Sequence, residues 1–241
     1  MISSEAGLAP ALAGEPGAGG PFDGIDFVVV DVETTGWSPR EAQITDLAAV
    51  RVRGGQVLGQ FCSLVNPGQA IPGHVTELTG ISDAMVAAAP PRDRVLAGFL
   101  QFAQGCVLTA HNAPFDVSFL AAACVASGLD WPDFTVVDTV TLARRVLGAS
   151  EVPDRKLATL ADFFGTATRP SHRALADALA TAEVLLALLP RATAAGLTML
   201  AELSAPLPPP SRLARLWRAA PRMLRAITRW GRARRAVRYR R

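Results

Sequence analysis

Three strand-like runs follow one another near the start of the chain, and they constrain the fold more than any other feature. The first, Phe27–Val30, is a short β-branched run typical of a buried strand. The next two, Ile44–Val52 and Val57–Val65, are separated by a segment containing Gly54-Gly55, a dipeptide typical of hairpin turns. We therefore predict a sheet that begins with three consecutive strands.

Helices and strands alternate in the region that follows. Helical spacing and short apolar runs predict helices over 92–104, 114–127, 139–147, 157–164 and 174–189, and strands over 106–110 and 135–137. Asp138 is expected to cap the helix at Thr139, and the last helix is expected to end before Pro190. Three strands followed by such alternation indicate an α/β domain with a mixed sheet, over about residues 25–190.

The segments outside that domain differ from it in composition. Residues 1–24 consist largely of Gly, Ala and Pro with few large apolar side chains, so we expect an N-terminal extension that is disordered. Residues 191–210 include a proline-rich stretch and are expected to form a linker. In residues 211–241, Leu and Trp recur at helical spacing between arginines, which predicts a basic amphipathic helical tail.

Charge divides the chain in the same way. Residues 211–241 hold 12 arginines and no acid, whereas the remaining 12 basic and 21 acidic residues leave residues 1–210 with a net charge of −9. Three hypotheses account for the tail: it binds nucleic acid non-specifically, it lies on an anionic membrane, or it docks on a protein partner such as a DNA polymerase. The first is favoured.

Other features point to a cytoplasmic protein. No apolar run approaches the roughly 20 residues that span a bilayer, and residues 1–20 have neither the basic start nor the apolar stretch of a secretory signal. Cys62, Cys106 and Cys124 are widely spaced and form no CxxC pair, so we expect reduced thiols.

Two carboxylates lie at the end of the first strand. Asp31 and Glu33 are two residues apart, and side chains with this spacing on a strand point to the same face. Oxygen ligands suit a hard divalent cation such as Mg²⁺ or Mn²⁺, which also relieves the repulsion between them. An ordinary acidic turn after a strand is the alternative explanation.

Three further residues have ordinary explanations when each is taken alone. Asp116 opens a predicted helix, where an acid commonly stabilises the helix dipole. Asp177 lies within an apolar helix, where an acid commonly faces solvent. His172 precedes that helix and is compatible with a capping or surface role.

Taken together, these segments resemble the DEDDh family of 3′→5′ exonucleases, which includes the proofreading epsilon subunits of bacterial DNA polymerase III. The resemblance rests on three motifs in order: Asp31-x-Glu33-Thr34-Thr35-Gly36, His111-Asn112-Ala113-Pro114-Phe115-Asp116, and His172-x-x-x-x-Asp177. Smaller agreements are Glu77–Ile81, similar to an "LTGI" segment, and Val137–Thr139, similar to a "DT" step. The resemblance covers about residues 25–190.

The resemblance implies a ribonuclease-H-like fold, with a mixed five-stranded sheet flanked by helices, and hydrolysis that uses two divalent ions, Mg²⁺ or Mn²⁺. By analogy, Asp31 bridges both ions, Glu33 and Asp177 hold the ion that delivers the attacking water, and Asp116 acts directly or through water. His172 is then the general base, because an imidazole titrates near neutral pH.

The same resemblance places the substrate. Thr34, Thr35 and Gly36 are expected against the 3′-terminal nucleotide, with Asn112 close by, while Trp37 is left out because it equally suits a structural role. The expected function is removal of nucleotides from a free 3′ end, single-stranded or frayed, with DNA favoured, in proofreading or repair. An RNA-trimming exoribonuclease and a non-catalytic accessory module that binds a polymerase or nucleic acid are the alternatives.

Overall fold

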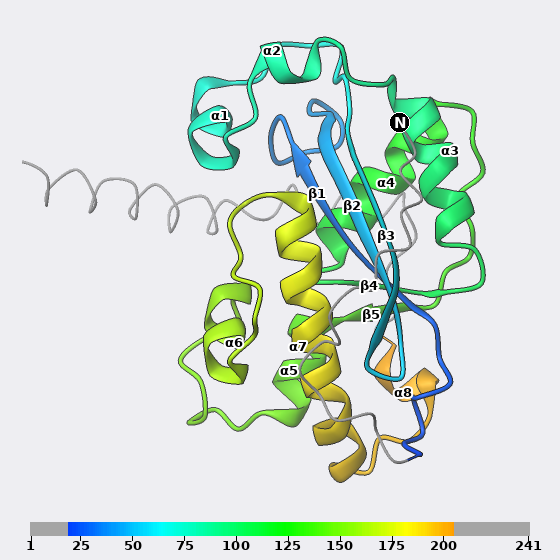
Figure 1. The fold of residues 1–241 in the computed structure, drawn as a ribbon, viewed down its shortest axis with the longest axis vertical. Helices are drawn as coiled ribbons and strands as arrows, with labels where there is room; N and C mark the ends of the chain where they lie inside the picture. Colours follow the sequence, from blue (N-terminus) through cyan, green and yellow to red (C-terminus); the bar gives the residue numbers. More distant parts are fainter. Residues whose placement is uncertain (1–18, 205–241) are drawn as a thin grey trace, which may run out of the picture. The chain divides into compact units, whose positions relative to one another are not determined.

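The computed structural model describes residues 19–204, which form a mixed sheet with helices on both faces (Figure 1). The five strands lie in the order β3-β2-β1-β4-β5. β1 and β2 pair antiparallel, as do β2 and β3, whereas β4 is parallel to β1 and to β5. The strands are β1 (Phe27–Thr34), β2 (Ile44–Arg53), β3 (Gln56–Leu64), β4 (Val107–Ala110) and β5 (Val136–Asp138). The predicted mixed five-stranded sheet is therefore confirmed.

Helices cover the two faces of this sheet. α7 packs on β1 and β2 together with α5 and α6, while α3 and α4 pack against each other and against β3 and β1. The short helices α1 and α2 lie near the end of β1 (Figure 1). The helices are α1 (Gly73–Thr79), α2 (Asp83–Val86), α3 (Arg92–Phe102), α4 (Pro114–Ala126), α5 (Thr139–Val146), α6 (Leu157–Phe164), α7 (Ala174–Ala194) and α8 (Leu200–Leu203).

A tight hairpin sets the register of β2 and β3. Gly54 and Gly55 have φ of 53° and 80°, between the paired residues Arg53 and Gln56. Positive φ at both central positions defines a type I′ turn, which glycine adopts without steric cost and whose twist matches that of the strands. The predicted Gly-Gly turn is confirmed.

The main core lies between the sheet and α7. Phe27 and Val29 of β1 pack in one cluster with Leu185 and Leu188 of α7, and all four are at least 99% buried. The alternation of β1 directs Asp31 and Glu33 toward the same face. The apolar alternation that builds the core therefore also aims both acids toward the start of α7.

The predicted end of the last helix at Leu189 is wrong. α7 continues through Pro190 to Ala194. Proline removes one backbone hydrogen bond and crowds the preceding turn, but Leu189 and Ala192, on either side of it, are buried in the core. Burial of these side chains offsets the local cost, so the helix passes the proline.

The folded part also extends beyond both expected domain boundaries. Phe22 belongs to the segment expected to be disordered, yet it is 97% buried in the main core. Leu203 of α8 belongs to the expected linker, and it is 98% buried in the same core. Ser204 forms an isolated β-bridge with Val137. Apolar side chains in the flanking segments therefore pack on the same core, with Leu197 and Leu200 accompanying Leu203. The predicted basic tail lies outside the described residues.

Within residues 19–204, no helix combines the length and hydropathy needed to cross a lipid bilayer.

Leu185→Ala tests the role of α7 in the core. Because Leu185 is fully buried between α7 and the sheet, its truncation is expected to lower the free energy of unfolding by about 2–5 kcal/mol. Leu58→Ala on β3 is the matched control, since that side chain is 50% exposed, and should cost less than about 1 kcal/mol. Urea titrations measure both; equal losses would contradict the assignment of the core.

Candidate active site

The site forms where β1 and β4 separate. β1 pairs with β4 only from Phe27 to Val29, although it stays paired with β2 as far as Thr34. The edge of β1 beyond Val29 is therefore free of β4, and the backbone N–H of Val32 donates instead to Asp116 Oδ1, at 3.1 Å. A side chain from α4 thus replaces a strand at this edge.

Asp116 reaches β1 because of its place in α4. The helix begins at Pro114, a residue whose fixed φ suits the first turn of a helix, and Asp116 lies in that turn, 97% buried. The structure therefore brings the acid of the second motif against the strand that carries the first.

α7 brings the third motif to the same place. Asp177 lies in the first turn of α7, 92% buried, and its Oδ1 accepts a hydrogen bond from the Ser171 N–H at 2.8 Å. The exposed His172 adopts a left-handed φ of 57°. Ligand atoms of Glu33, His172 and Asp177 all lie within 4.8 Å of one another, a spacing that suits a single cation. The alternative that Asp177 is a solvent-facing acid on an apolar helix is therefore wrong.

The electrostatics of these acids are unfavourable without a counter-charge. Burial raises the pKa of Asp31 well above its usual range, and the charges of Asp116, Glu33 and Asp177 add to the effect. Burial, followed by repulsion from Asp177 and Asp46, raises the pKa of Glu33 to about 8. Such crowding of carboxylates at one place is typical of a functional site rather than of a structural ion pair.

Burial also raises the pKa of the other two carboxyls. For Asp116 the opposing effect comes from backbone hydrogen bonds, including that from Val32. For Asp177 it comes first from the Ser171 N–H and then from the charge of His172. The chemistry of this set, four carboxylates and one imidazole, fits a hard divalent cation.

Asp46 is a neighbour of the site that was not predicted from the sequence. It lies on β2 directly opposite Glu33 and is 94% buried, with Arg173 Nε 3.7 Å from its Oδ2. Burial raises the pKa of Asp46, and the Arg173 charge opposes that shift. The available signal was an acid inside the apolar run Ile44–Val52, but only the pairing of β1 with β2 places it beside Glu33.

The predicted substrate residues lie at the end of β1 and in the turn before α4. The hydroxyl of Thr34 donates to the Gly36 carbonyl at 2.6 Å. The hydroxyl oxygen of Thr35 accepts from the Gln43 N–H at 2.9 Å and from Gln69 Nε2 at 2.7 Å. These bonds hold the Thr34–Gly36 segment in one conformation.

Two neighbouring side chains of the motifs have structural contacts. Trp37, 43% exposed, lies edge-on to Phe115 with ring centroids 6.2 Å apart. His111 Nδ1 lies 2.8 Å from Thr139 Oγ1, and burial lowers the pKa of His111 to about 4, so the ring is neutral. These contacts give His111 a structural role.

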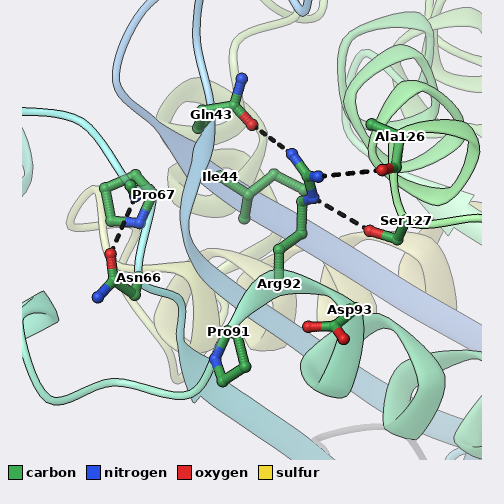
Figure 2. Close-up of a pocket in the computed structure, with 10 residues that line it drawn as sticks. Gln43, Ile44, Asn66, Pro67, Pro91, Arg92, Asp93, Ala126 and Ser127 are labelled. Atoms are coloured by element: carbon green, nitrogen blue, oxygen red, sulfur yellow. Dashed lines mark hydrogen bonds between the residues drawn. The ribbon is translucent and has the colours of Figure 1, made fainter.

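A cavity between β2, α3 and α4 does not coincide with the acids. It measures about 410 Å³ and is lined by the start of β2, the segment after β3, and the α3 and α4 helices. Arg92 crosses it to donate to Gln43 Oε1 at 2.7 Å and to Ser127 Oγ at 3.1 Å (Figure 2). None of the predicted site residues lines this cavity, so the candidate site is defined by the carboxylate cluster and not by the cavity.

Comparison with known proteins identifies the family of the chain. The family model described as Exonuclease (RNase_T) matches residues 28–185, which include all of the predicted site residues. A Mycobacterium tuberculosis protein with the provisional name of bifunctional exonuclease/endonuclease is 49% identical over 189 residues, 76% of this chain and 29% of that protein. A DNA polymerase III subunit epsilon-like protein of Rhodobacter capsulatus is 46% identical over 184 residues, 74% of this chain and 26% of its own length.

A third relative is longer still. A PolC-type DNA polymerase III of Caldanaerobacter subterraneus is 40% identical over 179 residues, 74% of this chain and 13% of the polymerase. The match to this chain thus spans less than a third of the length of each of these three relatives.

Solved structures share the fold. Exonuclease X in complex with 5′-overhanging duplex DNA has a TM-score of 0.56 and 24% identity, covering 74% of this chain and 97% of that one. The zinc-bound complex of Escherichia coli exonuclease I with single-stranded DNA has a TM-score of 0.62 and 20% identity, covering 72% and 42%. With the family model covering most of the chain and relatives close to half identical, the chain belongs to the exonuclease family.

Proposed function

We propose that this protein hydrolyses the terminal phosphodiester bond at the 3′ end of a nucleic acid, DNA in preference to RNA, with the help of divalent metal ions. The observation that carries the proposal is the convergence of Asp31, Glu33, Asp116 and Asp177, whose charges act on one another, with the exposed His172 close to Glu33 and Asp177. A binding module has no use for a crowded group of carboxylates that have lost much of their hydration.

The residues have distinct roles in this proposal. Asp31, Glu33 and Asp177 would hold the two Mg²⁺ or Mn²⁺ ions, and Asp116 would act on them directly or through water. The ions would supply Lewis acidity and a more acidic bound water. His172 is exposed and close to Glu33 and Asp177, and it would serve as the general base.

The relatives support DNA as the substrate. Two of them carry names of DNA polymerase III, and the structural neighbours bind single-stranded or overhanging DNA. Thr34, Thr35, Gly36 and Asn112 are proposed to contact the terminal nucleotide, because they border the acids at the ends of β1 and β4. We propose that this activity serves proofreading or repair.

Digestion of end-labelled oligonucleotides tests the activity. With Mg²⁺ or Mn²⁺, the protein should release 5′-mononucleotides from the 3′ end of single-stranded DNA and do so more slowly from RNA. His172→Ala should lower kcat by about 10²–10⁴-fold because the general base is lost, and Asp31→Asn should abolish turnover. Asp130→Asn, at an exposed acid outside the site, is the matched control.

Each pattern of digestion has a definite meaning. Faster release from RNA would favour the exoribonuclease alternative, and release from the 5′ end would overturn the proposed direction. Absence of hydrolysis with every metal would leave the accessory module as the better explanation.

The pH dependence of stability tests the electrostatics of the site. The pKa of Glu33 is raised in the folded protein to about 8 from an ordinary value of 4.5, so the folded state loses stability as pH rises between those values. In EDTA, Glu33→Gln should therefore raise Tm relative to the wild type at pH 8 and much less at pH 5. Mn²⁺ should raise the wild-type Tm at pH 8 more than that of the variant.

The control for this measurement is Glu77→Gln, which changes an exposed carboxylate on α1. Its Tm difference from the wild type should stay constant across the same pH range. A wild-type Tm that runs parallel to that of Glu33→Gln from pH 5 to 8 would contradict the predicted repulsion.

We also propose that residues 211–241, with their 12 arginines, attract nucleic acid to a body that is acidic. Deleting them in an Asp31→Asn background, which prevents digestion, should weaken binding to single-stranded DNA and flatten the dependence of log K on log salt. Unchanged affinity and slope would favour a membrane or protein partner for the tail.

A further inference from the structure

The carboxylate of Asp138, at the end of β5, accepts five hydrogen bonds. Its Oδ1 accepts from the N–H groups of Asn112 (2.9 Å), Ala113 (3.2 Å) and Val140 (3.2 Å). Its Oδ2 accepts from the N–H of Thr141 (3.3 Å) and from the Thr141 hydroxyl (2.6 Å). The sequence predicted a cap for α5, and the contacts with Val140 and Thr141 confirm it. The two remaining hydrogen bonds, from the N–H groups of Asn112 and Ala113, connect Asp138 to the start of α4.

Those two bonds hold the turn from β4 into α4. Asn112 has a left-handed φ of 67°, a conformation that is costly for a residue other than glycine and persists only where its surroundings enforce it. Ala113, the N-cap residue of α4, offers no side-chain cap. Asp138 supplies from β5 the acceptor that the turn lacks, at 94% burial, where an unpaired N–H would be expensive.

The conformation of the Asn112–Ala113 turn sets the position of Asp116. Asp116 is the third residue after Ala113, and α4 is helical from Pro114 onward. Asp116 reaches β1 through the contact of its Oδ1 with the Val32 N–H, at 3.1 Å. A shift of the turn by about an ångström would therefore carry Asp116 away from Asp31.

We propose that Asp138 is a positioning residue that fixes Asp116 for metal binding by holding the Asn112–Ala113 turn, in addition to capping α5. This inference rests on the proposed function, because it takes Asp116 as one of the groups that hold the ions. Asp138 itself contacts neither ion nor substrate; it acts through the backbone of α4.

Thr141→Val separates the two roles of Asp138. The substitution keeps the shape of the side chain and removes only the hydroxyl bond to Oδ2, so it weakens the α5 cap and leaves the bonds to Asn112 and Ala113 in place. Asp138→Ala removes both sets of bonds. Asp138→Asn keeps a neutral oxygen for the turn, and a neutral acceptor binds less strongly than a carboxylate.

The test is Mn²⁺ binding by isothermal titration calorimetry, with Tm and steady-state kinetics measured on the same proteins. Thr141→Val should lower Tm and keep the Mn²⁺ dissociation constant within about twofold of the wild type. Asp138→Ala should weaken Mn²⁺ binding by about 10–100-fold, the loss typical of groups that orient metal ligands. Asp138→Asn should fall between them, and KM at saturating metal should change little while kcat falls.

Equal Mn²⁺ affinity in Thr141→Val, Asp138→Ala and Asp138→Asn would overturn the inference and reduce Asp138 to a helix cap. If Asp138→Ala fails to fold, Asp138→Asn decides: a dissociation constant within about twofold of that of Thr141→Val contradicts the proposal. Failure of the proposed function is distinguishable, since a wild type that binds Mn²⁺ and hydrolyses no nucleic acid would refute the activity and leave the comparison of metal affinities intact.

Discussion

The crowding of carboxylates that have lost hydration, at the separation of β1 from β4, is the constraint on which the rest of this structure depends. Each acid loses hydration on burial, and each raises the pKa of its neighbours, as Asp31 and Glu33 show. Within residues 19–204, the cluster has no internal cation that could neutralise it fully, because Arg173 lies beside Asp46, at one edge. Its stability must therefore come from the elements that carry the acids and from bound metal ions.

Those elements are fixed far from the charges. β1 is the central strand, paired with β2 along its whole length, and α7 is anchored by apolar side chains such as Leu185 and Leu188. The core thus stabilises a strand and a helix whose ends carry the crowded carboxylates. This arrangement explains why the site lies at the ends of strands and helices, where side chains extend beyond the packed interior.

Three buried acids outside the predicted ligand set organise the surroundings. Asp138 joins β5 to the turn before α4, and Asp46 pairs with Arg173 next to His172. Glu183 of α7 accepts from the N–H groups of Ala167 and Thr168, at 2.5 and 3.1 Å, and so ties down the loop that leads to His172. Each of these carboxylates accepts hydrogen bonds or an ion pair from groups of the protein itself.

The sequence by itself determined the strands, the Gly54-Gly55 hairpin, most helices and the motif residues, because each depends on local spacing or on φ preferences. Tertiary structure decided the rest. Burial of Leu189 and Ala192 carried α7 past Pro190, and long-range strand pairing placed Asp46 opposite Glu33. Local sequence patterns specify which secondary structure a segment can form. Only tertiary packing specifies which distant segment it contacts, and whether burial offsets a local cost such as a proline within a helix.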